Sequence, residues 1–145
     1  MRWVGPITVD RLLDWGSDSS IPPPPLEPSV YIVSRLAWHN EPSVDCTPLY
    51  SGGLTSDSPR FRARIGDLIA DMFGFFGEVG KKGHHSGGQA IFRYCIENSV
   101  SPRHLYLGWA EDVSCHRCEE NRLYTKLSPE LNRKRPPPCP IHRSV

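Results

Sequence analysis

The sequence predicts a small α+β domain with its main elements in the order β-β-α-α-β-α. Short runs of β-branched and aromatic residues supply the strands, and longer segments with apolar residues at 3.6-residue spacing supply the helices. Strands and helices do not alternate as parallel βαβ units do. The length of 145 residues, with 38% hydrophobic residues, suits one modest core.

The first half of the chain contains a short helix, a spacer and two strands. Residues 9–15 are predicted to be helical, and the polyproline segment 19–28 is predicted to be extended. Residues 29–38 (SVYIVSRLAW) form the first predicted strand. Residues 48–54 (PLYSGGL) form the second, which pairs with it as a hairpin.

The second half is mainly helical. Apolar spacing predicts helices at 59–77, despite Gly66, and at 87–99, with a loop at 77–88 between them. Residues 103–111 (RHLYLGWAE) form the third predicted strand, and a last helix runs from Cys115 to Leu127.

Charge and composition limit the function classes. The net charge of +1 argues against a protein that coats DNA by electrostatics alone, although 60–64 and 133–135 form two local basic patches. No apolar run reaches 18 residues, so no membrane segment is expected. The odd count of five cysteines fits a reducing compartment. We therefore expect an intracellular protein, cytoplasmic or, in a eukaryote, nuclear.

Two charged residues lie on apolar helix stripes. Glu120 lies on the same helical face as Leu123, Tyr124 and Leu127. Arg64 lies at the edge of a similar apolar face on its own helix. A buried charge requires a partner. A structural ion pair between Arg64 and Glu120 would give each charge its partner. The functional alternative is that the Arg64 guanidinium binds an anion.

Two further groups of residues are candidates for binding. Tyr31 and Tyr50 lie in the first two strands, where packing alone would explain a tyrosine, but Gly52-Gly53 permits a close approach beside Tyr50. The cations of the loop before Ser86 would suit an anion at a helix N-terminus, or would simply be solvated. These loop cations are Lys81, Lys82, His84 and His85.

Four residues near the C-terminus have the spacing of zinc ligands. Cys115 and Cys118 form a C-x2-C pair, and Cys139 and His142 form a C-x2-H pair with 20 residues between the two. One Zn²⁺ bound by all four would staple the proline-rich tail to the last helix.

Residues 118–132 resemble the C-terminal motif of the GIY-YIG nuclease superfamily. Earlier segments are similar to the other family motifs: Ser29–Tyr31 to the GIY strand, Tyr50–Gly52 to the YIG strand, and the helix containing Arg64 to the family's arginine helix. The resemblance covers about residues 28–134. The matched slots of the C-terminal motif hold Glu120, Leu123, Tyr124, Leu127, Pro129, Leu131 and Asn132.

The resemblance implies a fold with a small three-stranded antiparallel sheet flanked by helices. It also implies a metal-dependent DNA endonuclease that leaves a 5′-phosphate and a 3′-hydroxyl. Glu120 would hold Mg²⁺ (or Mn²⁺), Arg64 would neutralise the scissile phosphate, and Tyr31 or Tyr50, perturbed by nearby cations, would deprotonate or orient the attacking water. Asn132 would fix the helix end or contact the DNA backbone. The other residues assigned to the site are His85 in catalysis, and Arg60, Arg62 and Lys82 in substrate binding.

The chain departs from the family pattern at several slots. Ser29 and Ser51 replace motif residues, Gly53 stands where many relatives have lysine, and Leu68 stands where many have histidine, a role that His84 or His85 would take over. These departures favour one alternative, a catalytically impaired nucleic-acid-binding module. A zinc-stapled protein-interaction domain with a PPPPL ligand motif is another.

This interpretation divides the chain into three parts. Residues 1–27 form an N-terminal helix and polyproline arm, 28–134 the nuclease-like domain, and 135–145 a tail. DNA is the expected partner, cleaved either at specific sequences or at branched structures. Cleavage of palindromic sites would require a homodimer, and structure-selective cleavage would involve a protein partner.

Overall fold

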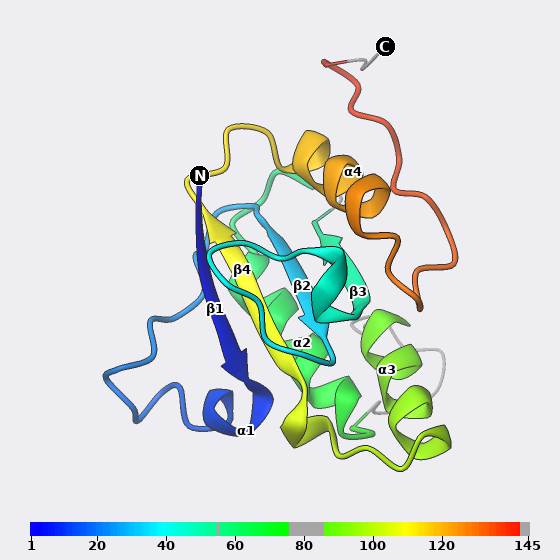
Figure 1. Cartoon of the computed structure of the whole chain (residues 1–145). Helices are drawn as coiled ribbons and strands as arrows, with labels where there is room; N and C mark the ends of the chain where they lie inside the picture. The colour runs from blue at the N-terminus through cyan, green and yellow to red at the C-terminus, as the bar shows by residue number, and fades with distance from the viewer. Residues whose placement is uncertain (55, 76–85, 143–145) are drawn as a thin grey trace.

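The computed structural model describes residues 1–54, 56–75 and 86–142, and within them it confirms the α+β class (Figure 1). Antiparallel strands form one sheet, and helices pack on it. In this part of the chain no helix is long and apolar enough to span a membrane. The elements are β1 (Arg2–Thr8), α1 (Val9–Leu12), β2 (Val30–Ser34), β3 (Pro48–Gly53), α2 (Phe61–Met72), α3 (Ser86–Glu97), β4 (Tyr106–Glu111) and α4 (His116–Leu127), with 3₁₀ turns at Val44–Cys46 and Pro102–His104.

The prediction of three strands was wrong, because the described residues form a four-stranded sheet in the order β1-β4-β2-β3. β1 pairs antiparallel with β4, so residues 2–8 belong to the sheet although the sequence analysis assigned them to an arm. Gly5-Pro6 interrupts the alternation that marks a strand, and the β1–β4 register shifts between Val4 and Ile7. Proline is tolerated because β1 is an edge strand.

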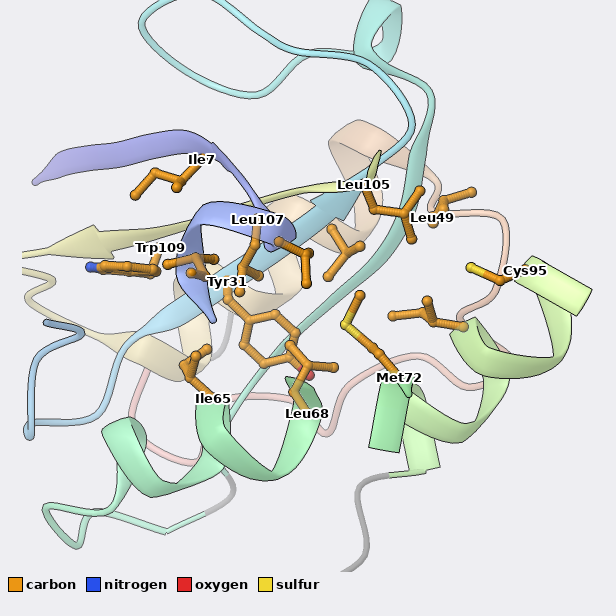
Figure 2. Close-up of a cluster of buried hydrophobic side chains, with 14 of the residues drawn as sticks. Ile7, Tyr31, Leu49, Ile65, Leu68, Met72, Cys95, Leu105, Leu107 and Trp109 are labelled. Carbon is orange, nitrogen blue, oxygen red and sulfur yellow. The ribbon is translucent and has the colours of Figure 1, made fainter. Parts of the chain in front are cut away.

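The two faces of the sheet carry separate cores. Tyr31 and Val33 of β2 point to the face covered by α1, α2 and α3, while Val30 and Ile32 point to the opposite face. This is the alternation expected for a strand buried on both sides. Figure 2 shows the first core, with Tyr31 facing Ile65 and Leu68 of α2.

Helix α4 covers the opposite face through Leu123 and Leu127, both almost fully buried. The helix ends at Ser128, which adopts a left-handed conformation with φ of 43°. The chain then follows the free edge of β3, where the Leu131 N–H donates to the Leu49 carbonyl at 2.8 Å. The residues after α4 are thus fixed against the strand that carries Tyr50.

The polyproline segment packs against the start of α2. The Phe61 N–H donates to the Leu26 carbonyl at 3.2 Å, and the Arg62 guanidinium donates to the Pro24 carbonyl at 2.7 Å. Ile21 is buried in the first core. This segment therefore braces the N-terminus of the helix that carries Arg64.

Candidate functional site

Four of the residues singled out in the sequence come together from four different elements. Tyr31 of β2 and Tyr50 of β3 stack with ring centroids 6.2 Å apart and an interplanar angle of 21°. Arg64 of α2 and Glu120 of α4 lie close enough to influence the pKa of both tyrosine hydroxyls. Residues far apart in the sequence thus form one polar cluster beside the end of β3.

Two glycines of β3 make room for this cluster. A Cβ at Gly52 would lie 2.7 Å from Tyr31 Cζ, so only glycine allows the ring to pack there. A Cβ at Gly53 would lie 3.4 Å from Glu120 Oε2 and 2.8 Å from the Ser29 carbonyl oxygen. The Glu120 carboxylate therefore approaches the backbone of β3 closely.

Arg64 and Glu120 do not form the structural ion pair that was one alternative. Both side chains are half-buried, and neither makes a hydrogen bond or an ion pair within 4 Å to another described residue. Burial raises the pKa of Glu120, while the positive charges of His116 and Arg64 oppose that rise. Two opposite charges thus face the cluster without neutralising each other directly.

The tyrosine hydroxyls are poor bases. Burial raises the pKa of Tyr31 well above its ordinary value, with a further rise from Tyr50 that Arg64 only partly opposes. Burial also raises the pKa of Tyr50, and Arg64 counteracts this only in part. Burial therefore favours the neutral phenol at both positions, and a neutral phenol can orient a water molecule.

His116 belongs to the same site and was missed in the sequence. It lies four residues before Glu120 in α4, and its side chain is 12% exposed. Its Nε2 lies 3.0 Å from Asp57 Oδ1, whereas its buried Nδ1 has no hydrogen-bond partner among the described residues. The i, i+4 spacing to Glu120 was the available signal.

The loop cations Lys81, Lys82, His84 and His85, which include the two predicted histidine substitutes, lie outside the described residues. Leu68, at the position where the GIY-YIG resemblance would place a histidine, is fully buried in the first core (Figure 2).

Asn132 fixes the chain after α4 to β3. Its Oδ1 accepts from the Ser51 N–H at 2.9 Å, and its Nδ2 donates to the Ser51 carbonyl at 2.8 Å. The oxygen and the nitrogen of the Asn132 side-chain amide therefore both bond to the backbone of Ser51. Asn132 therefore ties the segment after α4 to the edge of β3.

Basic side chains line two cavities next to the cluster. A cavity of about 380 Å³ contains Tyr50, Arg93, Arg133 and Lys134. A second, of about 320 Å³, contains Gly53, Arg64 and Arg60. Arg62, in contrast, is engaged with the Pro24 carbonyl.

The four candidate zinc ligands also come together. One ligand atom from each of Cys115, Cys118, Cys139 and His142 lies within 4.8 Å of the others. This group could hold a metal ion such as Zn²⁺.

Comparisons with protein-family models, with curated proteins and with solved structures found no match.

Proposed function

We propose that this chain is a metal-dependent DNA endonuclease of the GIY-YIG type that leaves a 5′-phosphate and a 3′-hydroxyl. The observation that carries the proposal is the convergence of Arg64 and Glu120 on two tyrosines without a direct ion pair between them. Half-buried charges that are left apart cost stability. A phosphodiester and a divalent cation, bound between them, would satisfy both.

Glu120 is the residue that would hold the divalent metal ion. Its carboxylate makes no hydrogen bond to another described residue and lies over Gly53, where a larger residue would crowd it. Mg²⁺ needs few protein carboxylates, because water and a phosphate oxygen fill its other positions. Bound there, Mg²⁺ or Mn²⁺ would supply Lewis-acid stabilisation of the leaving oxygen.

The other side chains of the site take the remaining roles in the proposed reaction. Arg64 binds a non-bridging phosphate oxygen and stabilises the charge that grows there in the transition state. The neutral hydroxyl of Tyr50 orients the attacking water. His116, which Asp57 engages through Nε2, adds a polar group beside Glu120 whose buried Nδ1 has no partner among the described residues.

The basic cavities favour a path for the nucleic-acid backbone. Arg93, Arg133 and Lys134 lie on the Tyr50 side of the cluster, and Arg60 lies on the Arg64 side. Contacts of this kind bind phosphates and carry no sequence information. We therefore propose that these residues hold the DNA strand on either side of the scissile bond.

The test is cleavage of supercoiled and branched DNA with Mg²⁺, by the parent protein and by Glu120→Gln. The matched control is Glu119→Gln, which removes a neighbouring acid that pairs with Arg122 instead. Glu120→Gln should lower the rate on the order of a hundredfold or more, and Glu119→Gln should leave it nearly unchanged. Omitting Mg²⁺, without a chelator, should abolish cleavage.

Equal activity of Glu120→Gln and the parent would refute the proposed role of Glu120. Binding without cleavage by the parent would instead favour the impaired nucleic-acid-binding module. The burial of Leu68 at the family's histidine slot is the observation that favours this alternative.

A further inference from the structure

The segment after α4 returns along that helix to its N-terminus. The Arg135 guanidinium lies 5.8 Å from the Tyr124 ring centroid, and Asn121 Nδ2 donates to the Pro137 carbonyl at 2.8 Å. The segment then reaches the start of α4, where Cys139 is buried, 6% exposed. Figure 1 shows it passing beside α4 in the opposite direction.

The sulfur and nitrogen atoms at this point have the spacing of a zinc tetrahedron. Cys115 Sγ lies 3.7 Å from Cys139 Sγ, and Cys139 Sγ lies 3.6 Å from His142 Nδ1. With Zn–S bonds of about 2.3 Å and Zn–N bonds of about 2.0–2.1 Å, tetrahedral edges are about 3.8 Å and 3.6 Å. Since no pair is more than 4.8 Å apart, closing the set takes a contraction of about 1.2 Å at most.

The backbone around these ligands is already arranged for them. The Cys118 N–H donates to Cys115 Sγ at 3.4 Å, and the His142 N–H donates to Cys139 Sγ at 3.3 Å. Such bonds orient sulfur ligands and offset their negative charge. Three thiolates, a neutral histidine and Zn²⁺ sum to one negative charge, which the N-terminus of α4 stabilises.

We propose that Cys115, Cys118, Cys139 and His142 bind one structural Zn²⁺ that clasps the C-terminal segment to the start of α4. Four protein ligands complete a tetrahedron and leave no position for substrate, so the ion has a structural role. This site is separate from the proposed Mg²⁺ position at Glu120.

The bound Zn²⁺ would restrain both the start of α4 and the segment that follows α4. It lies at the end of α4 that carries His116, and it anchors the far end of the segment whose near end Asn132 fixes to Ser51. Arg133 and Lys134 lie between these two anchors and line the cavity at Tyr50. Release of zinc should therefore free the basic segment first.

The first measurement is the zinc content of the purified full-length chain, by atomic emission, beside two variants. Cys139→Ala removes a buried ligand, and Cys95→Ala removes an equally buried thiol of α3 outside the cluster. The parent and Cys95→Ala should each hold one zinc per chain, and Cys139→Ala should hold none.

Two further measurements use only the parent chain, so they do not depend on whether a variant folds. Co²⁺ exchanged into the site should give tetrahedral ligand-field bands and thiolate charge-transfer absorption. Chelation should accelerate tryptic cleavage after Arg133 and Lys134 on the order of tenfold.

Several outcomes would overturn the proposal. Parent protein without zinc, or an octahedral Co²⁺ spectrum, would exclude the site. So would a Cys115–Cys139 disulfide found by mass spectrometry in protein kept under reducing conditions. Zinc that is retained by Cys139→Ala would place the ion elsewhere. None of these readouts depends on DNA cleavage, so the zinc site and the proposed endonuclease can fail separately.

Discussion

Asn132→Ala should destabilise the fold strongly, because one side chain satisfies both backbone groups of Ser51. Two hydrogen bonds, at 2.9 and 2.8 Å, are lost, and Ser51 is only 1% exposed. A buried backbone group left without its partner costs about 1–3 kcal/mol. For the two groups together, we expect the free energy of unfolding to fall by about 2–4 kcal/mol.

Urea denaturation measures this change directly. With a slope of about 2 kcal/mol per molar urea, the midpoint should fall by about 1–2 M. Asn121→Ala is the control, since Asn121 also donates to backbone carbonyls but does so near the surface, and it should cost less than about 1 kcal/mol. Equal, small losses in both variants would refute the anchoring role of Asn132. A loss of DNA affinity with unchanged stability would support the alternative role as a DNA contact.

Two further predictions concern the glycines and the tyrosines. Gly52→Ala should lower the free energy of unfolding by about 1–3 kcal/mol, because its Cβ would overlap the Tyr31 ring. Gly66→Ala, with open space around it, should raise the free energy of unfolding by about 0.5–1 kcal/mol. Both variants can be measured by urea denaturation, and a neutral Gly52→Ala would contradict the close packing of Tyr31 on Gly52. The raised pKa values of Tyr31 and Tyr50 favour the neutral phenols in the folded state, so this stabilisation is complete below the unfolded pKa of about 10 and is lost as pH rises through the folded values. Between about pH 9 and 11, the free energy of unfolding should decline less in Tyr31→Phe than in the parent protein. An equal decline in the two proteins would refute the contribution of Tyr31.

Much of the fold could be predicted because its elements have regular patterns. β2 alternates between two cores, and α2 keeps its apolar spacing through Gly66, as the sequence indicated. β1 was missed because a Gly-Pro pair reads as a turn. Its pairing depends on Gly5, whose φ is 109° and whose Cβ would lie 2.9 Å from the Leu107 carbonyl oxygen. That is a tertiary contact, which no local pattern encodes.

The site was predictable to the extent that single residues broke a pattern. Glu120 and Arg64 attracted attention because each places a charge on an apolar stripe. His116 did not, since its importance depends on Asp57, a residue 59 positions away that engages its Nε2. The direction of the tyrosine pKa shifts was also not predictable, because burial outweighs the charge of Arg64 and only the packed structure fixes burial.

Glu120 remains the residue that stability alone explains least well. Its raised pKa means that burial penalises the charged form, and the opposing charges of His116 and Arg64 do not fully offset that penalty. The fold could have removed the cost with an apolar residue or with a direct ion pair, yet Arg64 stays apart on a different helix. Such a cost is typical of functional sites, where a group is kept for what it binds. The arrangement is consistent if a cation supplies the missing charge at Glu120 and a phosphate supplies it at Arg64.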